Sequence, residues 1–158
     1  MSFYFRQDSD AIVQCAKNVQ YNLGNCFTRD VYMDALELEF AEAGLPFARD
    51  VPVPVYYKDR LLAATYRADF LVKDKIIVMV RAAGEDGGVR PFDHYALISM
   101  LNAARLNLAI LIQFTDKKVQ INRMCHYMRF ANSLNTKRGE TEFEPLEERP
   151  QGGMSLVD

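Results

Sequence analysis

The segment Leu108–Phe114 constrains the fold more than any other part of the chain, because it is apolar almost throughout. A continuously apolar run of this length is typical of a central strand that is covered on both faces of its sheet. The whole chain has 158 residues. This is the size of one domain with a core that needs no disulfide or metal to hold it. We therefore expect a single layered domain.

Apolar residues at helical spacing predict three helices. They are placed at Asp10–Tyr21, from Thr28 to the residue before Gly44, and from Pro91 through Ala104. Thr28 is a good N-cap, and Gly44 is a natural C-terminal stop. In the second helix, either Val31 or Tyr32 begins the buried face.

The remaining patterns predict strands joined by polar turns, at Phe47–Tyr57, Leu61–Val72, Ile76–Ala82 and Leu108–Phe114. Pro52 and Pro54 cannot donate to a ladder, so the first of these is an edge strand. Residues 119–124 form either a last strand or the lead into a helix that continues to Leu134. The order of helix, helix, three-strand meander, helix and strand predicts an α/β sandwich with a mixed central sheet.

Composition excludes several classes of protein and site. The longest apolar runs have five residues, against the ~20 that span a bilayer, so we expect a soluble intracellular protein without a membrane partner. The cysteines form no CxxC pair, and their odd number argues against a disulfide framework. With two histidines in unrelated segments, a structural zinc site is not expected. The residues concerned are Cys15, Cys26, Cys125, His94 and His126.

Charge is distributed unevenly along the chain. Residues 140–158 contain six acidic residues and one base, which gives −5, whereas residues 1–139 contain 18 Lys and Arg against 15 Asp and Glu, which gives +3. A mildly basic body with an acidic tail is compatible with nucleic acid or an acidic partner but does not demonstrate either.

The central hairpin brings together a small group of polar residues. If the chain turns about Asp74, residues whose numbers sum to 148 face each other, so Asp69 lies opposite Met79 and Arg67 lies opposite Arg81. All four would then share one face of the sheet. One Asp beside two positions spaced i, i+2 on the next strand is the geometry of a metal-dependent nuclease.

These segments resemble the GxxExxY family, a branch of the PD-(D/E)XK nuclease-like superfamily. The resemblance runs in unbroken order from Asp10 to about Met124. It is carried by Leu23-Gly24, Val31-Tyr32, Gly44-Leu45-Pro46-Phe47, Val51-Pro52-Val53-Pro54-Val55-Tyr56-Tyr57-Lys58, Tyr66-Arg67-Ala68-Asp69, Asp74-Lys75 and Leu111-Ile112-Gln113-Phe114. It implies an αβββαβ sandwich over residues 1–124. From their composition, we expect residues 125–138 to be a C-terminal helical extension and residues 139–158 an acidic, flexible tail.

The catalytic signature of that family is degenerate here. The family pattern is Asp followed by Glu-x-Lys, and this chain keeps Asp69 but has Met79 and Arg81 at the other two positions. A thioether is a poor ligand for Mg²⁺, and an Arg side chain cannot act as a base. In the name motif, Cys26 and Arg29 replace Gly and Glu, and Tyr32 remains. The related Gln-x-x-x-Tyr pattern falls on Ala96 and Met100.

The resemblance and its departures predict a catalytically inactive site, with no catalytic residue, metal or cofactor. Arg81, with or without Arg67, would then replace the metal as the counter-charge of Asp69. The alternative is a nuclease that uses Mg²⁺ or Mn²⁺ at a rearranged site, with Asp69 and Asp30 as ligands, or with Glu85 or Asp86 in the place of Asp30. A second carboxylate within about 4–6 Å of Asp69 would favour that alternative.

Four cations are tentative nucleic-acid-binding residues, because they would form a basic floor where phosphate once lay: Arg29, Arg67, Lys73 and Arg81. Otherwise they pair with Asp69, Asp30 and the acids of the second helix. The extension at 125–138 would dock to a protein partner or fold back on its own domain. The predicted function is therefore that of a catalytically inactive nuclease-fold protein that serves as a structural or interaction subunit of a nucleoprotein or multi-subunit assembly, with a nuclease or a non-cleaving nucleic-acid binder as the alternatives.

Overall fold

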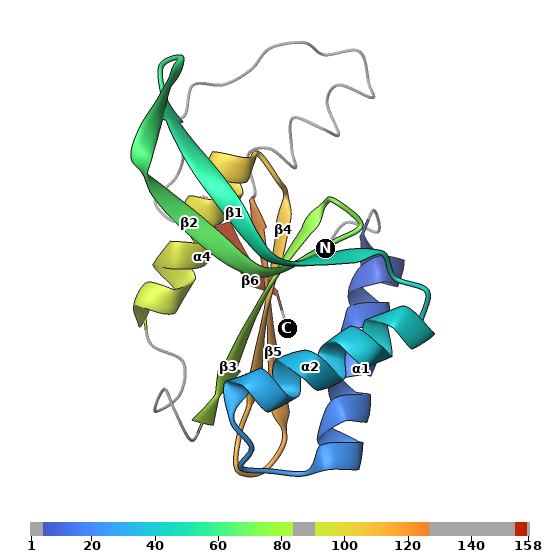
Figure 1. Ribbon diagram of the computed structural model, residues 1–158. Coiled ribbons are helices and arrows are strands. Elements are labelled where there is room, and N and C mark those ends of the chain that lie inside the picture. Colours follow the sequence, from blue (N-terminus) through green and yellow to red (C-terminus); the bar gives the residue numbers. More distant parts are fainter. Residues whose placement is uncertain (1–4, 84–90, 127–153, 158) are drawn as a thin grey trace.

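A mixed sheet runs through the middle of the molecule and carries helices on both faces (Figure 1). The computed structural model describes residues 5–83, 91–126 and 154–157. In chain order the elements are α1 (Arg6–Leu23), α2 (Arg29–Glu42), β1 (Phe47–Tyr57), β2 (Arg60–Val72), β3 (Ile76–Ala82), α4 (Pro91–Ala104), β4 (Leu108–Phe114), β5 (Val119–His126) and β6 (Met154–Val157).

The strands follow one another across the sheet in the order β1-β2-β3-β4-β5-β6. Only the β3–β4 pair is parallel among these neighbours, because α4 makes the crossover between them. The predicted α/β sandwich with a mixed sheet is confirmed. β1 lies at the edge, as Pro52 and Pro54 require, and β4 lies inside the sheet with all seven residues buried.

Two hydrophobic clusters form the core, one on each face of the sheet. The first lies between the sheet and helices α1 and α2, and it contains Ile12, Leu36 and Phe40 together with Phe70, Val78 and Ile110. The second lies under α4 and contains Leu97, Met100 and Leu101 together with Ile77, Met79 and Leu111. Neighbouring residues of β3 and β4 thus pack into opposite clusters, which is why these strands read as continuous apolar runs.

Helix boundaries differ from the prediction mainly at the N-terminus of α1. The helix begins at Arg6, four residues before Asp10, because Phe5 packs against the first cluster and Ser9 is buried. Thr28 occupies the N-cap position of α2 in an extended conformation. Tyr32 is buried and Val31 is exposed, so Tyr32 and not Val31 begins the buried face of α2.

The β2–β3 hairpin has the predicted register. Phe70 pairs with Val78, Leu71 with Ile77 and Val72 with Ile76, so each pair sums to 148. The turn residues Lys73 and Asp74 both have positive φ, at 53° and 56°. That combination is typical of a type I′ turn, which fits the twist of the two strands.

The side-chain face of the β1–β2 ribbon changes at Asp50 and Asp69. Arg49 pairs with Phe70, and Val51 pairs with Ala68. Phe70 packs into the cluster under α1 and α2, whereas Val51 and Ala68 pack into the cluster under α4. A regular strand would keep positions two apart on one face. Asp50 has φ 55°, so the backbone rotation occurs there and places Asp69 at the crossover.

The C-terminal predictions need two corrections. The first alternative for residues 119–124 is confirmed, but strand β5 continues to His126, so the domain boundary at 124 falls inside a strand. Residues Met154–Val157 form β6, antiparallel to β5, so the flexible tail is wrong for these four residues. These four residues have no periodic sequence pattern that would predict a strand, and they form one because their backbone groups pair with β5. The rest of the extension and tail, residues 127–153 and 158, lies outside the described residues, as does the predicted loop Gly84–Gly88.

In the described ranges, none of the helices has the length and apolarity that crossing a bilayer requires.

Candidate functional site

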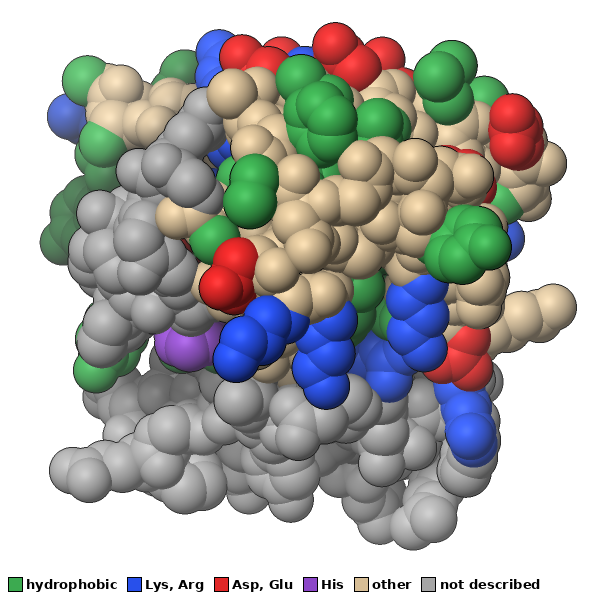
Figure 2. All heavy atoms as spheres, turned by 90° about the horizontal axis from the view of Figure 1, so that it is seen from below, with side chains coloured by type: hydrophobic (Ala, Val, Ile, Leu, Met, Phe, Trp, Pro, Cys, Tyr) green, Lys and Arg blue, Asp and Glu red, His purple; other side chains and the backbone are tan. Residues whose placement is uncertain are grey.

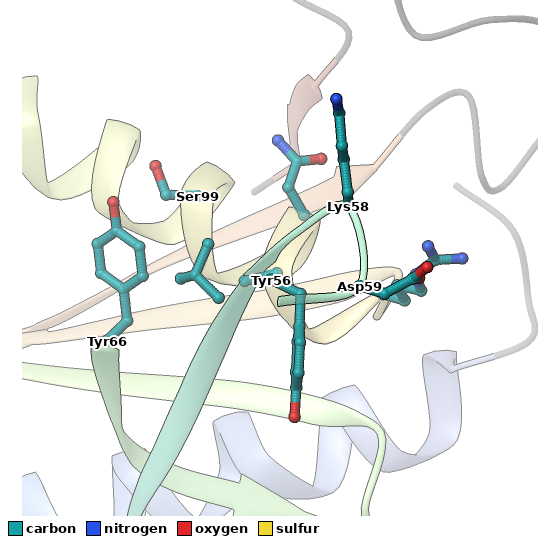
Figure 3. A pocket seen from close by; sticks show the side chains of 9 residues that line it. Tyr56, Lys58, Asp59, Tyr66 and Ser99 are labelled. Carbon is teal, nitrogen blue, oxygen red and sulfur yellow. The ribbon is translucent and has the colours of Figure 1, made fainter. Parts of the chain in front are cut away.

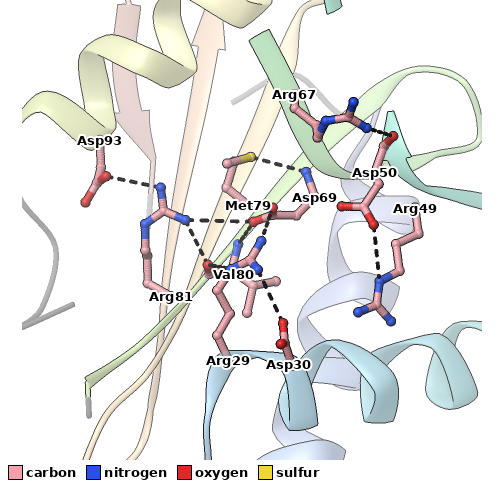
Figure 4. Close-up of polar contacts among 10 residues, drawn as sticks. All are labelled: Arg29, Asp30, Arg49, Asp50, Arg67, Asp69, Met79, Val80, Arg81 and Asp93. Atoms are coloured by element: carbon pink, nitrogen blue, oxygen red, sulfur yellow. Dashed lines mark hydrogen bonds and ion pairs between the residues drawn. The ribbon is translucent and has the colours of Figure 1, made fainter. Parts of the chain in front are cut away.

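Asp69 lies at the crossover in β2 and is almost fully buried. One carboxylate oxygen, Oδ1, accepts a hydrogen bond from Nη2 of Arg29 on α2. The other oxygen, Oδ2, accepts the Val80 N–H of β3 at 2.8 Å and lies 3.9 Å from Nη1 of Arg81. The carboxylate is therefore held by one backbone donor and two guanidiniums (Figure 4).

The backbone of Val80 on β3 joins these groups through both its N–H and its carbonyl oxygen. Its N–H donates to Asp69, and its carbonyl oxygen accepts from Arg29 Nε at 3.1 Å and from Arg81 Nη1 at 3.0 Å. Arg29 thus spans two oxygen atoms, the Asp69 carboxylate and the Val80 carbonyl. These oxygens are the kind of ligand that a hard divalent cation prefers, and a guanidinium lies between them instead.

Asp93 is the residue of this site that sequence reasoning missed. It lies in the first turn of α4, its side chain is buried, and its Oδ1 atom is 3.2 Å from Arg81 Nη2. Arg81 consequently joins Asp69 to Asp93. The sequence signal available for Asp93 was its position two residues after Pro91, which begins a predicted helix. Acidic residues are common in the first turn of helices, however, and the sequence does not show which of them are buried.

The pKa of the Asp69 carboxyl is raised above its ordinary value of 3.8, because burial disfavours the charged form. The Val80 N–H and the charges of Arg29 and Arg81 act in the opposite direction and offset burial only in part. Ionising Asp69 therefore carries a desolvation cost, and the Val80 N–H and the two guanidiniums recover part of that cost.

Met79 completes the immediate surroundings of Asp69. Its thioether sulfur accepts the Asp69 N–H at 3.4 Å, and its side chain belongs to the cluster under α4. Within residues 5–83, 91–126 and 154–157, no group of three or more His, Cys, Asp or Glu side chains is placed to hold a metal ion. The oxygen and sulfur donors next to the Asp69 carboxylate are the Val80 carbonyl and the Met79 thioether, and the Arg81 guanidinium stands between Asp69 and Asp93, so this arrangement does not fit Mg²⁺ or Mn²⁺.

The structure brings together some of the predicted site residues and separates others. Asp69, Met79, Arg81 and Arg29 meet. Arg67 is exposed and donates to the Asp50 carbonyl oxygen at 2.8 Å. The prediction that Arg67 shares a face with Asp69 is therefore wrong, because the strand changes face between them. Asp30 is mostly exposed and is 3.7 Å from Arg29 Nη1, so it pairs with the cation rather than adding to the carboxylate.

The predicted floor of four cations is likewise not assembled. Lys73 lies at the β2–β3 turn and donates to Asp8 of α1 at 2.6 Å. Arg29 and Arg81 remain as the cations around Asp69. Figure 2 shows a band of Lys and Arg side chains on the face that is seen from below. Glu85 and Asp86 lie outside the described residues.

The other positions that the predicted resemblance assigns to the signature are Tyr32, Met100 and Cys26. Tyr32 is buried, its hydroxyl donates to the Gly24 carbonyl oxygen at 2.9 Å, and its ring stacks on Phe114 with centroids 4.0 Å apart. Met100, at the position of the related Tyr, is buried in the cluster under α4. Cys26 is exposed, with φ 70°. Tyr32 and Met100 are thus core residues, and Cys26 is an exposed residue with positive φ.

One family model and one solved structure match this chain. A family model described as PD-(D/E)XK nuclease superfamily matches residues 6–124. Among solved structures, the crystal structure of SSO0001 matches with a TM-score of 0.49 and 13% identity. That match covers 75% of this chain and 62% of SSO0001, so the chain spans less than two thirds of that protein. A search of curated proteins finds no match.

Proposed function

The chain belongs to the PD-(D/E)XK nuclease superfamily, and we propose that it is a non-catalytic member in which the nuclease fold serves as a structural or interaction subunit. We assign it to the GxxExxY branch on the residues that carry that resemblance. In this proposal the site holds no divalent metal. The predicted role of residues 125–138 in docking a partner stays a prediction, since residues 127–138 lie outside the described ones.

One observation carries this proposal: Arg29 bridges the Asp69 carboxylate and the Val80 carbonyl. Metal-assisted hydrolysis needs a cation that polarises phosphate and lowers the pKa of a bound water. A guanidinium remains protonated, forms hydrogen bonds and has no open coordination position for water. It satisfies the two oxygens, but it cannot generate a nucleophile.

A cleavage assay tests the absence of activity. Full-length protein and Asp69→Asn are incubated with single- and double-stranded DNA and RNA in the presence of Mg²⁺ or Mn²⁺. We expect equal and background-level cleavage from both proteins. Metal-dependent cleavage by the wild type that Asp69→Asn abolishes would overturn the proposal.

A second experiment asks whether the guanidinium occupies the place of a cation. The variant Arg29→Ala/Met79→Glu removes the guanidinium and restores a second carboxylate, and Arg29→Ala/Met79→Leu is its matched control. Ligands that bind only the folded state stabilise it, by about 2.7 kcal/mol at 100 times Kd. We expect Mn²⁺ to raise the melting temperature of the Glu variant only, and a comparable rise in the wild type would contradict the proposal.

A metal-dependent nuclease with a rearranged site is the second candidate, and Asp93 is the observation that favours it. Asp69 and Asp93 are both buried and converge on the Arg81 guanidinium. If Arg81 moved away, these two carboxylates would remain as ligands. In that case Asp93→Asn and Asp69→Asn would each abolish cleavage in the assay above, whereas Asp30→Asn would not.

A further inference from the structure

An open groove of about 860 Å³ lies between the β1–β2 hairpin and the C-terminal half of α4 (Figure 3). This volume is in the range of known ligand sites, ~300–1,000 Å³. The hairpin contributes Tyr56, Lys58, Asp59 and Tyr66, and the other wall contains Ser99, Asn102 and Arg105. Asp93 lies in the first turn of α4, roughly 9 Å along the axis from Ser99 and roughly 14 Å from Asn102. The groove is thus separate from the site around Asp69.

Aromatic side chains are unusually exposed beside this groove. Tyr56 is 61% exposed, Tyr57 is 64% exposed and Tyr66 is 40% exposed. The first eight residues of β2 are all exposed, so this part of the hairpin projects from the domain as a two-stranded ribbon (Figure 1). Exposed tyrosines on a projecting ribbon lack the burial that stabilises aromatic side chains in a core.

The hairpin also has a local excess of positive charge. Between Pro52 and Arg67 it carries three cations, Lys58, Arg60 and Arg67, and one acid, Asp59. The whole chain, by contrast, has 19 Lys and Arg against 21 Asp and Glu. Arg105 adds a further cation on the α4 side of the groove. Ser99 adds a hydroxyl to the same wall, whereas the Oδ1 atom of Asn102 already bonds to the His126 ring at 2.7 Å.

We propose that this groove binds single-stranded nucleic acid, with Tyr66 and Tyr56 stacking on bases and Lys58 and Arg105 contacting phosphates. Accessible aromatic rings next to cations are the two features that sequence-indifferent single-strand binding requires. A duplex fits less well, because its base faces are already stacked. A second copy of the chain also fits less well, because a two-fold contact would set this cationic ribbon against itself.

The proposal does not rest on the proposed function, since the groove and the Asp69 site lie at different turns of α4. Binding is measured by fluorescence anisotropy with labelled 20-nucleotide single-stranded DNA and RNA and with a duplex, over a range of salt concentrations. We expect saturable binding of the single strands that weakens as salt rises. Tyr66→Ala should weaken binding at least about fivefold, whereas Tyr66→Phe should keep it, because stacking needs the ring and not the hydroxyl. Tyr21→Ala, at an exposed tyrosine on α1, is the control and should have no effect.

The predicted phosphate contacts of Lys58 and Arg105 are tested with glycine variants, because glycine is compatible with the backbone conformation at both positions. Lys58 and Arg105 have φ 53° and 56°, a conformation that glycine adopts without strain. Lys58→Gly/Arg105→Gly should therefore remain folded while its salt slope, in log Kd against log salt concentration, falls by about 1.4. Lys117→Ala/Lys118→Ala removes the same charge from the β4–β5 turn and should leave the slope unchanged. The proposal would be overturned if the wild type showed no saturable binding of single strands at low salt. It would also be overturned if Tyr66→Ala and Lys58→Gly/Arg105→Gly bound single strands as tightly as the wild type does. A concentration-dependent dimer in sedimentation experiments that Tyr66→Ala abolishes would overturn it as well.

Discussion

Two aspartates in this protein each face two cations from other elements, but their surroundings differ. Asp8 of α1 contacts Lys73 and Lys75 at 2.6 and 2.7 Å, and both lysines are more than a third exposed. Asp69 contacts Arg29 and Arg81, whose side chains are 27% and 18% exposed. The pKa of Asp8 is lowered by hydrogen bonds from the two lysines, whereas the pKa of Asp69 is raised by burial.

The comparison shows that surroundings, and not the number of cations, decide what an ion pair contributes. The Asp8 side chain is 14% exposed, but its lysine partners are 36% and 37% exposed, and their hydrogen bonds outweigh the desolvation of the carboxylate, so the charged form of Asp8 is stabilised. In the interior the desolvation of a carboxylate exceeds the attraction that two guanidiniums supply. The surface cluster ties α1 to the β2–β3 turn at a small gain. The buried cluster becomes costly as soon as one partner is lost.

The largest test of this difference removes a partner of the buried aspartate. Arg29→Met leaves the Asp69 carboxylate with one guanidinium at 3.9 Å, and we expect it to lower the free energy of unfolding by about 3 kcal/mol. Urea denaturation at neutral pH measures the change. Arg29→Met/Asp69→Asn removes both charges and should recover most of the loss. A cost below about 1 kcal/mol for Arg29→Met would mean that water already solvates Asp69.

The corresponding change at the surface should have a smaller effect. Asp8→Asn removes one charge from a cluster whose lysines remain hydrated, so we expect a loss of about 1 kcal/mol or less in the same assay. Asp10→Asn is the control on α1, because Asp10 is 55% exposed and its ion pairs with Arg6 and Arg123 are 3.8 and 3.1 Å long. If Asp8→Asn cost as much as Arg29→Met, the contrast between the two clusters would fail.

The pH dependence of stability should separate the two aspartates by sign. The raised pKa of Asp69 means that the folded state holds this proton more tightly than the unfolded state, so stability falls as pH rises from 3.8 through that pKa. The lowered pKa of Asp8 means that its contribution is present above pH 3.8 and is lost as pH falls through its folded value. Urea midpoints are measured from about pH 2.5 to 6.5. The fall in stability with rising pH should disappear in Asp69→Asn, and the loss of stability with falling pH should disappear in Asp8→Asn. Slopes of the same sign would contradict this assignment.

The smallest effect concerns the reactivity of the buried Cys15 thiol, whose pKa is shifted by burial and by nearby carboxylates. Burial raises the pKa of the Cys15 thiol to about 11, and the nearby Glu39 adds to the rise. Burial also raises the pKa of Cys125. Cys26, by contrast, is exposed. Mass spectrometry after iodoacetamide treatment of the native protein should find Cys26 modified first, and rapid modification of Cys15 would be inconsistent with its burial.

Much of the fold could be predicted because the relevant signals are local. Period and turn chemistry located the helices and strands, Pro52 and Pro54 identified the edge strand, and the turn about Asp74 predicted the register of β2 and β3. The start of α1 was less predictable, since it depends on Phe5 packing against the core. Strand β6 was not predictable either, because its residues gain backbone partners from β5.

The site shows the same division more sharply. The sequence by itself determined that Met79 and Arg81 stand across the hairpin from Asp69 and Arg67, because those positions follow from strand alternation and hairpin register; that they replace a Glu and a Lys of a family signature stays a prediction. Only the tertiary structure decided which charges meet Asp69. Arg29 reaches it from α2, 40 residues earlier in the chain, and Asp93 joins through Arg81 from α4. Arg67 points elsewhere because the ribbon changes face at Asp50 and Asp69. Burial and long-range contact depend on how the layers pack, and residue spacing along one strand does not contain that information.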